Sequence, residues 1–168
     1  MRSSRLWDVA AALAIGFALW KIFLAPRSFA APHAQPAPHA VFQRLDGGAF
    51  RLADERNRIV FLDFYASWCT PCKIEMPLVQ HWANAHRDAL VVPVDVGEDR
   101  AAVADFAGRY RLNDVAIDPS SSARALFAVQ GFPTIVVVDG AGDIRARWEG
   151  LNPAIGLAMS NALSLGKR

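Results

Sequence analysis

The chain has 168 residues, of which 53% are hydrophobic and 20% charged, and its formal net charge is +2. This length suits one globular domain plus a further segment. The 18 basic and 16 acidic residues form no basic block interleaved with aromatics, so nucleic acid is not an expected partner. The only two cysteines, Cys69 and Cys72, exclude a disulfide-dense scaffold and supply only half the ligands of a structural zinc site.

Residues 1–25 are predicted to be an export segment, either a signal peptide or a signal anchor. A basic start with Arg2 and Arg5 precedes an apolar span over residues 6–25. A span of about 20 residues can cross a bilayer if Lys21 reaches the interface. The basic residues ahead of it favour a cytoplasmic N-terminus and an exported remainder.

Two forms of this segment are open. The small residues Ser28 and Ala30 suit a cleaved signal peptide. Trp20 and Lys21 suit a membrane interface and favour an uncleaved anchor. Either form places the domain outside the cytoplasm, on the periplasmic side, and the anchor would hold it at the inner membrane.

A proline- and alanine-rich stretch, residues 26–40, is predicted to be an extended, semi-rigid linker. The domain is expected over residues 41–168. It begins with residues 41–52, in which two short alternating runs flank a glycine turn and predict a β-hairpin.

Strands and helices alternate in the rest of the domain. In chain order we expect a buried strand over 59–65, a helix from Cys69–Cys72 to about 85, a buried strand over 90–96, a helix over 99–110, a short strand over 115–117, a helix after Ser122 that carries Ala125, Leu126 and Val129, a buried strand over 135–138, an edge strand over 144–148 and a helix over 152–165. Pro93 conflicts mildly with its strand, because proline removes a ladder donor. This order predicts an α/β fold around one mixed sheet.

Cys69 and Cys72 lie where a buried strand turns into a helix. Backbone N–H groups and the helix dipole favour a thiolate at Cys69, the predicted nucleophile and the more exposed thiol. Cys72, one turn later, is placed to attack a mixed disulfide at Cys69. Metal binding by the pair is the alternative reading of a lone Cys-x-x-Cys.

Three other positions bear on this chemistry. Asp63 lies inside an apolar strand, where burial would raise its pKa and make it a proton acceptor for Cys72. Phe132 and Pro133 directly precede a buried strand, a place that a cis bond at a tight turn would suit, although local sequence favours an ordinary trans turn. Glu75, one turn after the cysteines, is expected on a solvated helix face.

Taken together, these residues resemble a known family. The stretch from Asp63 to Lys73, followed by Pro77, and the later Gly131-Phe132-Pro133-Thr134 resemble thioredoxin. Glu75-Met76-Pro77, the hairpin ahead of the first central strand and the extra helix and strand over 99–117 resemble the TlpA/ResA branch of membrane-anchored extracytoplasmic thioredoxins. The resemblance implies a thioredoxin fold with an N-terminal β-hairpin and a central helix–strand insertion.

The resemblance also implies a site. Cys69, Cys72 and Asp63 would be catalytic, Pro133 would be cis and lie against Cys69, and no cofactor beyond the Cys69–Cys72 disulfide would be needed. The residues expected to contact substrate are Trp68, Thr70, Pro71, Phe132, Pro133 and Thr134. The lysine that thioredoxin places near its buried aspartate is replaced here, and Pro93 is the residue expected in its place.

The leading hypothesis is a monomeric, membrane-tethered reductant of disulfides in exported proteins. Its expected partners are exported protein thiols and a membrane electron donor, and the resemblance suggests substrates in cytochrome c or copper-site assembly. The alternatives are a periplasmic disulfide oxidase or isomerase and a Cu(I)-binding module that uses the two soft thiolates. A peroxiredoxin usually has threonine three residues before its cysteine, where this chain has Ala66.

Overall fold

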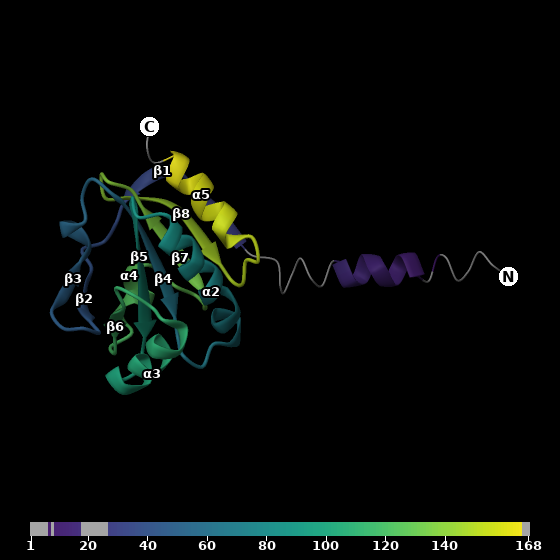
Figure 1. Ribbon diagram of the computed structural model, residues 1–168. Helices are drawn as coiled ribbons and strands as arrows, with labels where there is room; N and C mark the ends of the chain where they lie inside the picture. Colours follow the sequence, from purple (N-terminus) through teal and green to yellow (C-terminus); the bar gives the residue numbers. More distant parts are fainter. Residues whose placement is uncertain (1–6, 8, 18–26, 166–168) are drawn as a thin grey trace.

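The computed structural model describes residue 7 and residues 9–17 and 27–165 (Figure 1). Residues 9–17 are helical. Among the described residues, no helix has both the length and the apolar character needed to cross a bilayer. Much of the predicted export segment, including residues 1–6 and 18–25, lies outside the described residues.

The domain is built on one mixed sheet of eight strands in the order β1-β8-β7-β4-β5-β6-β2-β3. The strands are β1 (Arg27–Pro36), β2 (Val41–Arg44), β3 (Ala49–Arg51), β4 (Ile59–Tyr65), β5 (Ala89–Val96), β6 (Ala116–Asp118), β7 (Thr134–Val138) and β8 (Asp143–Glu149). The helices are η1 (Leu52–Asp54), α2 (Thr70–Ala85), α3 (Arg100–Tyr110), α4 (Ser122–Leu126) and α5 (Ile155–Leu165). The α/β fold predicted from the sequence is confirmed.

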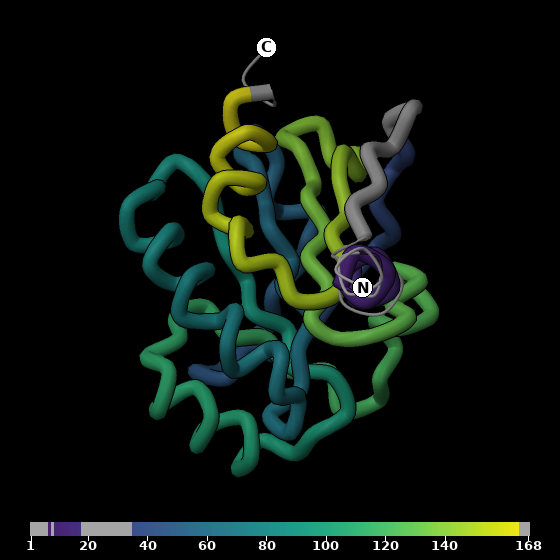
Figure 2. Tube along the Cα trace, turned by 90° about the vertical axis from the view of Figure 1, so that its right-hand side faces the viewer, coloured from purple at the N-terminus to yellow at the C-terminus, as the bar shows by residue number. Residues whose placement is uncertain are grey.

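Strand β4 lies near the centre of the sheet, between β7 and β5, and every one of its residues is buried. It pairs in parallel with β5 and antiparallel with β7. Its side chains alternate between two apolar clusters, so that Phe61 packs on Trp82 of α2 with ring centroids 5.0 Å apart, and Phe64 packs on Phe127 after α4 at 5.2 Å. Helices α2 and α5 lie side by side over the Phe61 face (Figure 2).

The expected insertion is also present. β6 pairs in parallel with β5, and the hairpin of β2 and β3 continues the sheet beyond β6. β6 pairs with β5 only from Val94 onward. Pro93, which has no backbone N–H, therefore costs the sheet no hydrogen bond between β5 and β6. Helix α4 ends at Leu126, so Val129, expected on that helix, lies in the following loop.

The linker prediction for residues 26–40 is wrong over residues 27–36, which form β1 and pair antiparallel with β8. β8, expected at the edge, therefore lies inside the sheet. The pairing is irregular between Ala30 and Gln35, and Pro32 lies in that interruption. An edge strand needs ladder bonds on one side only, so it tolerates prolines that composition alone assigns to a linker.

Because β1 covers the outer side of β8, removing it should destabilise the sheet. A chain lacking residues 1–36 should lose about 2 kcal/mol or more of unfolding free energy relative to a chain lacking residues 1–26, through lost backbone hydrogen bonds. Urea unfolding of the two shortened chains measures this difference. Equal midpoints would show that β1 contributes nothing to the domain.

Candidate active site

A disulfide joins Cys69 and Cys72 at the start of α2. Cys69 is the N-cap residue, and the Cys72 N–H donates to its Sγ at 3.1 Å. Both cysteines are almost fully buried, with 4% of Cys69 and 1% of Cys72 exposed. A sulfur that receives a backbone N–H at a helix N-terminus is stabilised as a thiolate once the disulfide is reduced.

A pocket of about 440 Å³ opens beside Cys69. Trp68, 67% exposed, forms one wall and meets Phe132 edge to face, with ring centroids 6.0 Å apart. The other lining residues are Thr70, Pro71, Arg124, Gln130 and Gly131. The structure thus brings together Trp68 and Phe132, predicted from distant parts of the sequence, in one pocket with Cys69.

The remaining predicted substrate residues are Pro133 and Thr134. The Phe132–Pro133 bond is cis, as the family resemblance implies and against the local trans expectation. Pro133 and Thr134 are buried, and neither lines the pocket. The Thr134 hydroxyl donates to the Gly131 carbonyl at 2.8 Å and so braces this loop, while the predicted substrate contact of Thr134 stays a prediction.

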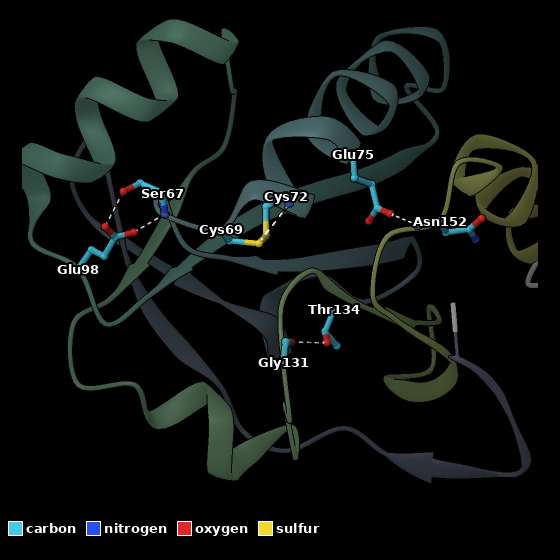
Figure 3. Close-up of a disulfide and its surroundings, with 8 residues drawn as sticks. All are labelled: Ser67, Cys69, Cys72, Glu75, Glu98, Gly131, Thr134 and Asn152. Atoms are coloured by element: carbon cyan, nitrogen blue, oxygen red, sulfur yellow. Dashed lines mark hydrogen bonds between the residues drawn. A yellow bond between two sulfur atoms is a disulfide. The ribbon is translucent and has the colours of Figure 1, made fainter. Parts of the chain in front are cut away.

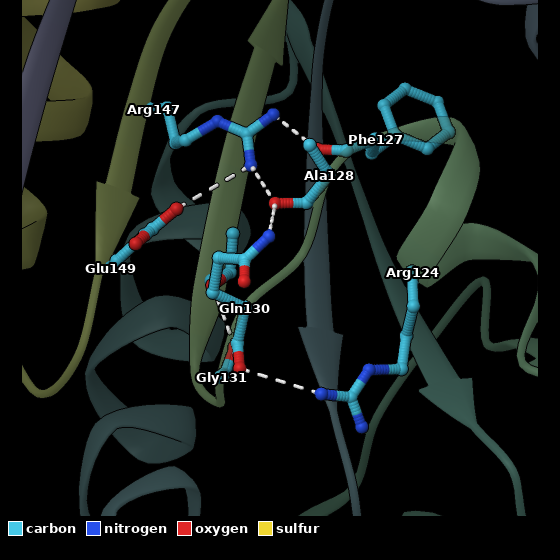
Figure 4. A network of polar contacts seen from close by, with 8 residues as sticks. Arg124, Phe127, Ala128, Gln130, Gly131, Arg147 and Glu149 are labelled. Carbon is cyan, nitrogen blue, oxygen red and sulfur yellow. Dashed lines mark hydrogen bonds and ion pairs between the residues drawn. The ribbon is translucent and has the colours of Figure 1, made fainter.

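Arginines hold the loop that precedes Pro133 (Figure 4). Arg147 of β8 donates to the carbonyls of Phe127 and Ala128 and pairs with Glu149 at 3.5 Å. The Arg124 guanidinium lies 5.7 Å above the Phe132 ring. Sequence reasoning missed both arginines, because their partners are backbone carbonyls or a ring brought near only by the fold.

Asp63 is 2% exposed, and its Oδ1 has no hydrogen-bond partner among the described residues. Burial raises its pKa well above the usual value, and the charge of Glu75 raises it further. The raised pKa predicted from the sequence is confirmed. Pro93 is its register partner on β5, so the residue beside Asp63 on the neighbouring strand is a proline, which carries no charge.

Glu75 corrects a sequence-based expectation. It is 3% exposed, not solvated, and its Oε2 accepts the Asn152 N–H at 2.6 Å (Figure 3). Burial raises its pKa to about 7, although the hydrogen bond from Asn152 opposes the rise. The missed signal is helical spacing, because Glu75 shares the buried face of α2 with Cys72 and Val79.

A second acidic group, absent from the sequence-based site, lies near the loop between β4 and α2. Asp95 is fully buried, and Glu98 contacts Ser67, two residues before Cys69. Among the described residues, no three His, Cys, Asp or Glu side chains come together as metal ligands. The chemistry available here is thiol–disulfide exchange next to buried acids.

Comparison with known proteins agrees with this arrangement. Residues 33–147 match the AhpC/TSA family. Thiol-disulfide oxidoreductase ResA of Geobacillus kaustophilus is 30% identical over 79% of this chain and 77% of its own length. A solved Chlorobium tepidum structure, a candidate thiol:disulfide interchange protein DsbE, is 26% identical with a TM-score of 0.73 over 79% of this chain and 96% of its own. The exposed lipoprotein thioredoxin of Streptococcus pneumoniae is 26% identical, with a TM-score of 0.63 over 76% and 98% of the two chains.

Glu75 should make the stability of the oxidised protein depend on pH. Since its pKa is raised to about 7, its contribution is fully present below the unfolded-state pKa near 4.3 and is lost as pH rises through 7. Glu75→Gln should therefore remove up to about 3 kcal/mol of the fall in unfolding free energy between pH 4.5 and pH 8. Urea unfolding at a series of pH values measures this change.

The exposed Asp54→Asn serves as the control for this titration. Its stability curve should keep the shape of the wild-type curve. If Glu75→Gln also keeps that shape, Glu75 does not carry a raised pKa in the folded protein.

Proposed function

The chain belongs to the AhpC/TSA family and is a thiol-disulfide oxidoreductase of the ResA type, and from this premise we propose that it reduces disulfides of exported proteins through a Cys69–Cys72 dithiol. The observation that carries the proposal is the Cys69–Cys72 disulfide, which caps α2 and borders an apolar pocket. An extended substrate segment in this pocket would bring its sulfur to Cys69 between Trp68 and Phe132.

The proposed reaction has two exchange steps. The Cys69 thiolate attacks one substrate sulfur, the substrate S–S bond breaks, and the departing sulfur takes a proton from solvent. Cys72 then gives up its proton and attacks Cys69 Sγ, which releases the second substrate sulfur and closes the Cys69–Cys72 disulfide. Two electrons have passed to the substrate, and a dithiol donor at the membrane would return them.

The buried carboxyl groups support the second step. The repulsion between Asp63 and Glu75 favours one proton on the pair. The Asn152 N–H favours the ionised form of Glu75, whereas Asp63 Oδ1 has no hydrogen-bond partner among the described residues. We propose that Asp63 exchanges the proton of Cys72 and that Glu75 sets how readily Asp63 gives it up. Coupled acids with raised pKa values suit proton transfer near neutral pH.

The reducing direction and the location rest on the sequence. Pro71 before the second cysteine favours a reductant, and the basic start followed by an apolar run favours export. The pneumococcal relative, named an exposed lipoprotein thioredoxin, supports a site outside the cytoplasm. We propose anchoring through residues 1–25, with substrates in cytochrome c or copper-site assembly.

Trapping tests the order of attack. Cys72→Ala should accumulate mixed disulfides at Cys69, because no second thiol remains to release the substrate. Non-reducing electrophoresis and mass spectrometry of exported proteins identify the adducts. Cys69→Ala is the matched control and should trap nothing. Adducts that form only through Cys72 would reverse the two roles.

The reduction potential tests the direction. A reductant should have a Cys69–Cys72 potential nearer to thioredoxin's, about −270 mV, than to the oxidant DsbA's, about −120 mV. Equilibration with glutathione, read by mass shift after thiol alkylation, gives the value. A potential near that of DsbA would favour the oxidase alternative.

A further inference from the structure

Ser67 lies between the end of β4 and Cys69, and both of its donors reach one carboxylate. Its hydroxyl donates to Glu98 Oε1 at 2.6 Å, and its N–H donates to Glu98 Oε2 (Figure 3). The Cys69 N–H in turn donates to the Ala66 carbonyl at 3.1 Å. Glu98 therefore fixes the backbone of the turn that delivers Cys69 to α2.

Glu98 is itself held firmly. It follows Gly97, whose φ of +93° favours glycine, and the Gly97 N–H donates to the Asp118 carbonyl at 2.9 Å. A Cβ at Gly97 would also come within 2.8 Å of the Ser121 hydroxyl. On the other side, Asp99 caps α3 by accepting the Ala102 N–H at 2.9 Å. Because this turn is fixed at both ends, Glu98 presents its carboxylate to Ser67 in a set position.

Asp95, near the end of β5, is a buried neighbour of Glu98. It is 0% exposed, and neither carboxyl oxygen has a hydrogen-bond partner of the ordinary donor–acceptor kind among the described residues. Its polar neighbour is Glu98, whose backbone N–H lies outside ordinary hydrogen-bond geometry but still favours the ionised form of Asp95. The two carboxyl groups can share a hydrogen bond only if one of them is protonated. Ser67 donates to both Glu98 oxygens, so the proton belongs on Asp95.

The surroundings favour the same distribution of charge. Burial, followed by the interaction with the Glu98 carboxyl group and the charge of Asp118, raises the pKa of Asp95 to about 8, although the Glu98 N–H opposes the rise. For Glu98, burial alone would raise the pKa, but the donors of Ser67 and the hydrogen bond with Asp95 outweigh it and lower the value. Tyr65 and Asp63 of β4 face the same region, and Asp99 follows Glu98. None of these groups brings a positive charge to the pair.

We propose that Glu98 and a protonated Asp95 act as one positioning unit that holds the Ser67 turn and thereby sets the reactivity of Cys69. Asp95 donates its proton to Glu98, and Glu98 accepts both donors of Ser67. Loss of that proton leaves two carboxylates side by side, which repel each other and weaken the hold on Ser67. The reactivity of Cys69 is then coupled to pH by a group that touches neither sulfur nor substrate. The readout of this coupling rests on Cys69 being the nucleophile, as proposed above.

The test follows the reduced, full-length protein between pH 6.5 and pH 9.5. The NMR shift of the Ser67 amide proton should change with a midpoint near pH 8, and the alkylation rate of Cys69 by iodoacetamide should fall about threefold from its plateau over the same range. Asp95→Asn should abolish the pH-dependent change in both the Ser67 amide shift and the alkylation rate. It should keep the alkylation rate that the wild type has at neutral pH, because an asparagine amide donates to Glu98 at every pH. Glu98→Gln should lower the alkylation rate of Cys69 at neutral pH and should also abolish its change between pH 6.5 and pH 9.5. Asp105→Asn, an exposed carboxylate on α3 paired with Arg109, should behave as wild type.

A Ser67 amide shift that stays constant over this range would overturn the proposal whether or not the variants fold. An alkaline transition that persists in Asp95→Asn, or a Glu98→Gln protein with the wild-type rate and profile, would also overturn it. Peptide mapping of the alkylated wild-type protein shows which cysteine has reacted, and this distinguishes failure of the positioning unit from failure of the proposed function. Modification at Cys72 instead of Cys69 would contradict the proposed roles of the cysteines, while the Ser67 titration would still test the positioning unit.

Discussion

Burial of carboxyl groups behind a disulfide is the constraint on which this site depends. Asp63, Glu75 and Asp95 are each less than 4% exposed, and burial is the largest cause of the raised pKa of each. A charged carboxyl in such surroundings costs several kcal/mol of desolvation unless it is protonated or well hydrogen-bonded. The apolar packing of β4 on both of its faces must offset this cost. The core around β4 therefore makes it possible for the domain to keep acids next to its two cysteines.

Two acids, Glu75 and Glu98, lie on opposite sides of the disulfide and have different neighbours (Figure 3). Glu75 receives one backbone donor, from Asn152 ahead of α5, while Glu98 receives both donors of Ser67. One donor leaves Glu75 with a pKa at about 7, whereas the Ser67 donors and Asp95 lower that of Glu98. Burial and hydrogen-bond donors together therefore set the two pKa values, because Glu75 is the more buried group and has the fewer donors.

The sequence predicted the elements well where a local pattern determines them. The apolar run of β4, the capped start of α3 and the Cys-x-x-Cys turn were all placed within a residue or two. The errors share a physical origin in contacts between distant segments. β1 was taken for a linker because edge pairing uses backbone groups and leaves little mark on composition. Glu75 was taken for a surface residue because its cover, the loop at Asn152, is 77 residues away in the chain.

The role proposed for Asp63 does not require a lysine beside it. Its register partner is Pro93, which brings neither a charge nor a donor. Within the described residues no cation offsets the charges of Asp63, Glu75 and Asp95, since the causes that raise their pKa values are burial and other acids. Where a lysine would hold an aspartate ionised, this arrangement keeps protons on buried acids chiefly by burial, and neighbouring acids add to the effect at Asp63 and Asp95. Proton exchange at the cysteines would then depend on how charge is shared among carboxyl groups, so a change at one of them is expected to alter the titration of the others.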